Sequence, residues 1–180
     1  KVSERLIRLG KQGNYFFNDG REPFVCIDVS SSCKVVKVRS RTFSNLLLKR
    51  YFDETGTVPQ SEVMNQTKSF FEASASFSEN VHPVFSRVGE RAGKMFYDLN
   101  HGIGKSIVEV STEGWDVIGK SPVHFLSPSN MASQVMPLEG GGDVKKLLKH
   151  VRFKSSADKI LYLVYVISCF VHGIPHPILI

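Results

Sequence analysis

Cysteine is scarce in this chain. Its 180 residues include only Cys26, Cys33 and Cys169, which form neither an even set for a disulfide framework nor the spacing of a zinc site. Such usage is typical of a reducing compartment, where cysteine behaves as a small hydrophobic residue. No secretory signal opens the chain, and the apolar helix expected from Ile160 to Val171 is too short to span a bilayer. These absences predict a cytoplasmic protein without a membrane partner.

Catalytic and metal-binding constellations are also lacking. His172 and His176 are four residues apart, but a glycine and a proline between them prevent one helix face from presenting both to a metal. No carboxylates pair into an acid–base dyad, and no Ser, Cys or His arrangement supports a nucleophile. The sequence therefore predicts no catalytic residue, metal site or cofactor site in this segment.

One short motif resembles part of a phosphate-binding loop. Gly104-Lys105-Ser106 matches the end of the pattern Gly-x-x-x-x-Gly-Lys-Ser/Thr, but Leu99 stands where the first glycine is required. The residues that follow, Ile107 to Val110, alternate like a strand, whereas the motif needs a helix N-terminus there. We interpret these residues as a hairpin loop and reject them as a nucleotide site.

Positive charge is concentrated in the N-terminal part of the chain. Residues 1–50 contain 11 Lys and Arg against 4 Asp and Glu, whereas the remainder contains 12 against 13. A basic region of this kind is compatible with nucleic acid, whose phosphates such side chains contact with little regard to base sequence. A solvated basic face is the alternative, and it stays open. The residues predicted to bind nucleic acid are Lys37, Arg39, Arg41, Lys49 and Arg50.

The first 80 residues alternate between helical and strand patterns. Val2 to Gly10 predicts a short amphipathic helix ended by the glycine. Three short strands follow within residues 15–39, the first two joined by an Asp-Gly turn. Helical spacing returns in Thr42 to Phe52, with Ser40 or Thr42 as the cap and Gly56 as the end, and in Gln60 to Ala75. The two helices suggest a helix-turn-helix, although such pairs are also common as packing units.

The central part of the chain changes to strands. Apolar runs separated by glycine-containing turns occupy residues 84–126, which predicts an antiparallel meander. Residues 127–142 are rich in Ser, Pro, Asn and Gly and are expected to form an arm or linker. Asp143 to His150 then predicts a basic amphipathic helix.

The last stretch, Ser155 to Ile180, is the most apolar. After the helix of residues 160–171 and a Gly-Ile-Pro turn, Pro177 to Ile180 has the continuous aliphatic character of a buried parallel strand. In nucleotide-binding α/β domains such a strand leads into the phosphate loop. An apolar tail packed on the chain's own core is the alternative. Because the chain begins with Lys1 and stops within this run, we expect it to be a fragment of a longer protein.

The order of several weak motifs resembles a known family. The motifs, in order, are Val38-Arg39-Ser40-Arg41-x-Phe43, Tyr51-Phe52-x-x-Thr55-Gly56-x-x-Pro59, His82-Pro83-Val84-Phe85-x-Arg87-Val88, Phe96-Tyr97-Asp98-Leu99, Gly114-Trp115-x-Val117, Pro122-Val123-x-Phe125 and Met136-Pro137-Leu138. Together they cover nearly the whole chain. They resemble the region ahead of the P-loop ATPase domain in replication proteins of the primase/helicase type encoded by phages and mobile elements.

That resemblance implies a role in replication of a mobile element. DNA binding, or positioning of a homo-oligomer, would lie ahead of an ATP-driven motor. ATP and Mg would bind only the continuation beyond Ile180, and no catalytic residue is carried over. The rival interpretations are an ATPase or helicase fragment that serves only as scaffold, and a protein-interaction domain without nucleic acid.

The expected fold class is α+β. Residues 1–80 form a basic hairpin with a helix pair, residues 81–126 an antiparallel β region, residues 127–142 the arm, and residues 143–180 the helical start of a truncated α/β ATPase domain.

Overall fold

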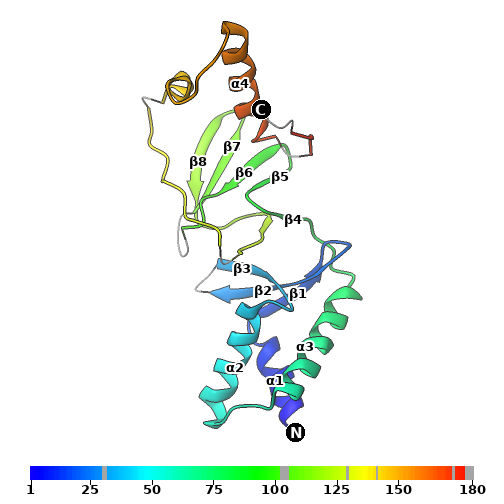
Figure 1. Ribbon diagram of the computed structural model, residues 1–180. Helices are drawn as coiled ribbons and strands as arrows, with labels where there is room; N and C mark the ends of the chain where they lie inside the picture. The colour runs from blue at the N-terminus through cyan, green and yellow to red at the C-terminus, as the bar shows by residue number, and fades with distance from the viewer. Residues whose placement is uncertain (30–31, 102–105, 129, 141, 172, 177–180) are drawn as a thin grey trace.

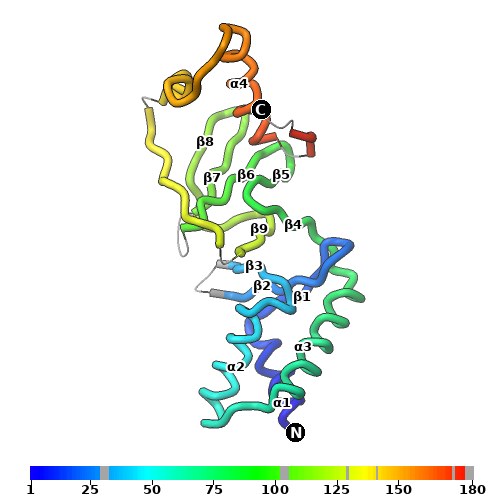
Figure 2. Tube along the Cα trace, in the orientation of Figure 1, coloured from blue at the N-terminus to red at the C-terminus, as the bar shows by residue number. Residues whose placement is uncertain are grey.

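A three-stranded and a four-stranded β-sheet follow one another along the long axis of the molecule, with a two-stranded pair beside the second and helices at both ends (Figure 1). The computed structural model describes the whole chain except residues 30–31, 102–105, 129, 141, 172 and 177–180. Helices and antiparallel strands are both present, so the predicted α+β class is confirmed. The tube in Figure 2 follows the chain from the N-terminal helices, through both sheets, to the C-terminal helix at the opposite end.

The N-terminal unit consists of three helices on one face of a three-stranded antiparallel sheet. The helices are α1 (Val2–Lys11), α2 (Arg41–Thr55) and α3 (Ser61–Ser76), and the strands are β1 (Asn14–Asn18), β2 (Pro23–Val29) and β3 (Ser32–Lys37). The strands pair in the order β1-β2-β3. The three predicted strands and both helices of the predicted pair are therefore confirmed in number and order.

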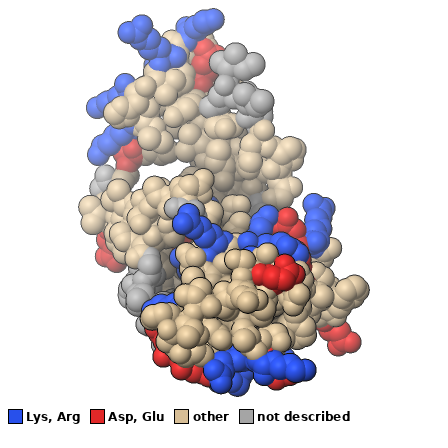
Figure 3. Space-filling model, turned by 60° about the horizontal axis from the view of Figure 1, so that its bottom comes forward, with Lys and Arg blue, Asp and Glu red and all other residues tan. Residues whose placement is uncertain are grey.

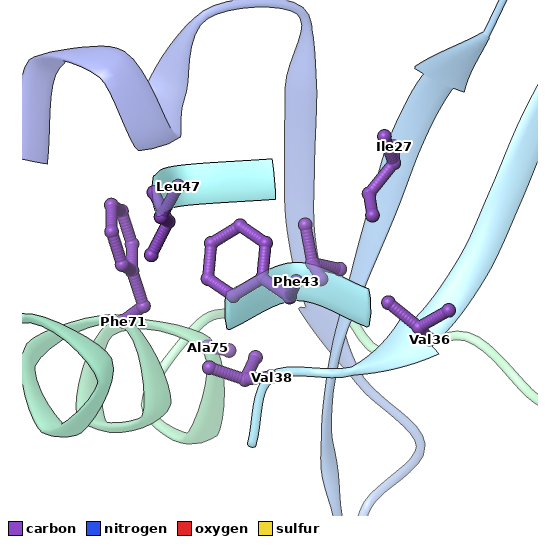
Figure 4. Packing of buried hydrophobic residues seen from close by; sticks show 8 residues of the cluster. Ile27, Val36, Val38, Phe43, Leu47, Phe71 and Ala75 are labelled. Carbon is purple, nitrogen blue, oxygen red and sulfur yellow. The ribbon is translucent and has the colours of Figure 1, made fainter. Parts of the chain in front are cut away.

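The core of this unit lies between the helices and the sheet. Phe43 and Leu47 of α2, Phe71 and Ala75 of α3, and Ile27 of β2 are all buried there (Figure 4). Because α2 and α3 both direct their apolar residues into this core, they act as parts of one helical layer. In Figure 1, α1 lies between them, and it contacts both.

Local sequence signals set the ends of α2 as predicted. The Ser40 side chain accepts a hydrogen bond from the Phe43 N–H, which satisfies one of the free donors at the start of the helix. Gly56 adopts φ 67° at the other end, and its N–H bonds to the Phe52 carbonyl. A residue without Cβ takes this left-handed conformation at little cost.

Gly10 was predicted to end the first helix, and this prediction is wrong. The helix continues to Lys11, and Gly10 is buried against α3. A Cβ at this position would lie 2.3 Å from Cζ of Phe71. The glycine is thus required by the close approach of a phenyl ring to the helix backbone.

The second unit is an antiparallel meander with a short parallel pair beside it. The strands are β4 (Val84–Phe85), β5 (Val88–Arg91), β6 (Lys94–Asp98), β7 (Ile107–Ser111), β8 (Gly114–Ile118) and β9 (His124–Phe125). The order β5-β6-β7-β8 confirms the predicted meander, but β4 and β9 pair in parallel and outside it. The strands of this pair are the first and last of the region, so their pairing depends on how the meander between them folds. Phe85, Phe96 and Phe125 belong to its buried core.

Backbone hydrogen bonds join the two units. The Ser127 N–H bonds to the Val35 carbonyl at 2.9 Å, and the His82 N–H bonds to the Asn18 carbonyl at 2.9 Å. Phe17, Phe24 and Val35, on the sheet face away from the helices, are buried at this junction. The N-terminal sheet is therefore covered on both faces.

The cysteines differ from expectation. Cys26 and Cys33 form a disulfide between β2 and β3, and Cys169 is free and exposed. The antiparallel register pairs Cys26 with Val35 and Asp28 with Cys33, which brings the two Cα atoms to 5.4 Å. The odd total of three cysteines did not indicate this disulfide, whose two cysteines lie on adjacent strands of a hairpin. Cysteine usage consequently no longer supports the predicted reducing compartment.

The predicted arm is attached to the second unit. The described residues between 127 and 142 form no helix or strand. The segment is nevertheless held in place, because the Gln134 N–H bonds to the Leu99 carbonyl and the Arg87 guanidinium donates to the Ala132 carbonyl.

The C-terminal segment lies at the end of the molecule opposite the N-terminus (Figure 1). The predicted basic α-helix is a 3₁₀ helix, η1 (Val144–Lys149), and the apolar helix is α4 (Ser156–Ser168). Neither contains a buried residue. The predicted strand of residues 177–180 falls outside the described residues. Within the described part of the chain, no helix is both long and apolar enough to cross a bilayer.

Candidate functional site

The five basic residues predicted to bind nucleic acid lie at the end of β3, in the turn that follows it and on α2. Lys37 pairs with Glu22 at 2.6 Å, and Lys49 pairs with Asp53 at 2.6 Å within α2. These pairs lie on different elements, since Glu22 is in the β1–β2 turn. Figure 3 shows acidic side chains beside the basic ones at the end that carries α1–α3.

Arg39 is also paired, by α3. Its Nε donates to Glu72 Oε2 at 2.7 Å, and this hydrogen bond holds the pKa of the Glu72 carboxyl below its ordinary value. The guanidinium is exposed, so water screens the pair and it contributes little to stability.

Arg50 and Arg41 have contrasting surroundings. Arg50 Nη1 donates to the carbonyls of Leu9 and Gln12, each at 2.8 Å, and so ties α2 to the end of α1. Carbonyls at a helix C-terminus have no partner within the helix, and a guanidinium satisfies them well. Arg41 is exposed at the start of α2 and makes no ion pair with a described residue. Arg50 is therefore structural, and Arg41 is the freest of the five.

Replacing Arg50 is expected to destabilise the fold. Arg50→Ala removes two charge-assisted hydrogen bonds and should lower the free energy of unfolding by about 1–2 kcal/mol. Lys49→Ala is the matched control on the same helix, since losing its exposed i,i+4 pair should cost less than about 0.5 kcal/mol. Urea denaturation of both variants checks this, and equal effects would contradict the structural role of Arg50.

A second basic region was not among the residues that the sequence analysis predicted to bind nucleic acid. Residues 143–159, here called the basic segment, contain six cations and two acids. The cations are Lys145, Lys146, Lys149, Arg152, Lys154 and Lys159. All are exposed, and none forms an ion pair with a residue that the structure describes.

The two acidic residues of the basic segment accept hydrogen bonds from backbone N–H groups. Asp143 Oδ1 accepts from the Lys145 N–H at 2.9 Å and caps η1. Asp158 Oδ2 accepts from the Lys154 and Ser155 N–H groups at 3.1 and 2.9 Å at the start of α4. Whole-chain charge counting hid this region, because the acids of residues 51–140 balance it. A count in shorter windows would have found it.

A cavity of about 530 Å³ lies between the two sheets. Val35, Ile107 and Phe125 contribute an apolar lining, and Lys34 and Lys120 contribute charge. The size is that of a ligand site. Several of its polar groups are already engaged in the fold; for example, Ser121 Oγ donates to the Val123 carbonyl at 2.6 Å.

Two titratable residues of this cavity have shifted pKa values. Burial raises the pKa of Asp98, against the opposing effects of a hydrogen bond from the Asn100 N–H and of the Arg87 charge. Burial lowers the pKa of His124, and the charges of His82 and Arg91 act in the same direction. The His124 ring also packs on Phe17, with centroids 4.6 Å apart, so it belongs to the junction of the two units.

The lowered pKa of His124 predicts sensitivity to mild acid. The folded chain disfavours the charged ring, so stability is fully present above the unfolded pKa of about 6.5 and falls as the pH drops through that value. His124→Gln should flatten this part of the stability–pH curve. His150→Gln is the control, because His150 is exposed. Denaturation midpoints between pH 5 and 7.5 test it, and an unchanged slope in His124→Gln would contradict the prediction.

The Gly-Lys-Ser motif that was rejected as a nucleotide site is followed by a strand. Gly104 and Lys105 lie outside the described residues, but β7 begins at Ile107, directly after Ser106. The predicted strand is therefore confirmed, and the described residues show no helix N-terminus at this place. Among the described residues, no cluster of three or more His, Cys, Asp or Glu is arranged to hold a metal ion.

Comparison of the chain with protein-family models, with curated proteins and with solved structures finds no match.

Proposed function

We propose that this chain is the DNA-binding region that precedes the ATP-driven motor of a mobile-element replication protein. The resemblance in motif order supports the assignment. The observation that carries it is the C-terminal segment, where α4 and η1 bury no residue while every neighbouring cation is unpaired within the described structure.

The apolar character of α4 supports the link to a further domain. Residues 160–167 are apolar without interruption, and exposed fractions are 64% for Ile160 and 57% for Val164. A helix that is apolar on all sides belongs in the interior of a domain, and α4 is too short to span a membrane. Just beyond its end, the ring of Phe170 lies against that of Tyr97 in β6, with centroids 5.7 Å apart. In the proposal, α4 belongs to the core of the motor domain, where ATP and Mg would bind.

Exposed cations support the DNA partner. A protein that neutralises phosphates releases counterions, and its affinity therefore falls steeply with salt. The chain presents the basic segment at one end. At the other end it presents Arg41 and the exposed ion pairs that Lys37, Arg39 and Lys49 make with acidic residues. Both are compatible with contacts that depend on phosphate rather than on base sequence.

Fluorescence anisotropy with labelled single-stranded and duplex DNA, over a series of salt concentrations, tests the proposal. We expect binding at 50 mM salt and a linear fall of log K with log salt, by about 0.7 per phosphate contact on a single strand. Absence of binding at low salt would overturn the DNA assignment and favour the rival, a scaffold or protein-interaction region. The exposed face of α4 is the observation that favours this rival.

A further inference from the structure

We infer that the basic segment, and not the basic N-terminal third, is the main phosphate-contacting surface of the chain. This inference rests on the proposed function, since it locates the DNA contact within it. The total charge directs attention to residues 1–50, but the pairing of those charges in the structure points to residues 143–159.

Six of the eleven Lys and Arg side chains in residues 1–50 are engaged by the fold, and the others, Arg41 among them, have no carboxylate partner among the described residues. Arg5 and Arg8 both reach Glu54, at 3.4 and 2.6 Å, and Lys37, Arg39 and Lys49 each have a carboxylate partner. Arg50 is committed to two carbonyls. A phosphate that approaches these residues must displace a carboxylate and meets its repulsion, so the attraction is reduced.

The basic segment has the opposite arrangement. Its six cations are exposed and lack a carboxylate partner among the described residues, and its two carboxylates accept backbone hydrogen bonds as helix caps. Lys146 and Lys149 are three residues apart in η1, and a 3₁₀ helix places such residues on the same side, about 6 Å apart along the axis. The result is a concentration of exposed cations without carboxylate partners in the described structure, at the end of the molecule that carries η1 and α4 (Figure 1).

A polyanion of the nucleic-acid type fits this surface better than an anionic membrane. Interfacial membrane helices carry charge on one face and apolar side chains on the other face of the same helix. Here the charges lie before α4 or at its first turn, while the remainder of α4 is apolar on every side. The six-residue η1 is too short to supply a membrane-binding face by itself.

Two variants with equal change in charge test the inference. The first replaces Lys145, Lys146, Lys149 and Arg152 with Gln, and the second replaces Lys37, Arg39, Arg41 and Lys49 with Gln. Arg50 is kept in both because it ties α2 to α1. Urea denaturation first establishes that each variant folds, and circular dichroism establishes that the helices remain.

DNA anisotropy over the salt series then separates the outcomes. We expect the affinity of the first variant for DNA to fall about tenfold or more at low salt. The slope of log K against log salt on a single strand should become shallower by about 2–3 in that variant. Both losses should be clearly smaller in the second variant. Equal losses, or a larger loss in the second, would overturn the inference and leave the proposed function standing. If the unmodified chain binds no DNA, both fail. Binding to phosphatidylserine vesicles without binding to DNA would also overturn both.

Discussion

Phe71→Ala is expected to lower the free energy of unfolding by about 3–5 kcal/mol. The ring is fully buried, stacks on Phe16 with centroids 4.6 Å apart, and meets Phe43 edge-on at 5.5 Å. It also fills the space against the backbone of Gly10. Its loss would leave a cavity at the point where all three N-terminal helices meet the sheet.

Phe77→Ala is the matched control for that prediction. Phe77 follows α3 directly and is 90% exposed, so its truncation should change stability by less than about 0.5 kcal/mol. Urea denaturation of both variants gives the comparison. A loss below about 1 kcal/mol in Phe71→Ala would show that the N-terminal core is organised differently.

The second large effect concerns association. We expect the chain to self-associate at micromolar concentrations through the exposed apolar residues of α4. Replacing Ile160, Val164 and Ile167 together with Gln should then abolish this association and leave the free energy of unfolding almost unchanged. Apolar surfaces of this extent promote association, and here the three side chains are 57–64% exposed. In an ordinary core the same substitutions would cost several kcal/mol each. A loss of self-association without a loss of stability would show that α4 lies outside the chain's own core.

Sedimentation velocity and urea denaturation measure the two effects. Replacing Val135 and Leu138 with Gln supplies the control, since both are exposed apolar residues on the arm. Their loss should leave association unchanged. If the α4 variant unfolds at much lower urea, the helix contributes to the chain's core and the proposal that it belongs to a second domain is contradicted.

Sequence periodicity predicted most of the fold because its signals are local. Ser40 and Gly56 bound α2 through contacts within a few residues, and the alternation of the central region gave the meander. Features that depend on residues distant in sequence were missed. The parallel pairing of β4 with β9 and the approach of Phe71 to Gly10 follow from tertiary packing, which no local pattern specifies.

The candidate site was harder to predict, for an electrostatic reason. Counting charges located Arg39 but could not show that Glu72 would pair with it, whereas the i,i+4 spacing of Lys49 and Asp53 on a helix is a local signal that a charge count overlooks. Glu72 is 33 residues from Arg39, so the pair forms only when α3 packs beside the end of β3. The sequence showed which residues are charged; which of them are available to a phosphate depends on the fold.

Hydrogen exchange with and without DNA tests the central claim most directly. We expect a bound oligonucleotide to slow exchange of the backbone amides of residues 144–154, with little change in α2 and α3. Protection confined to residues 37–50, or an exchange pattern unaffected by DNA at low salt, would contradict the account.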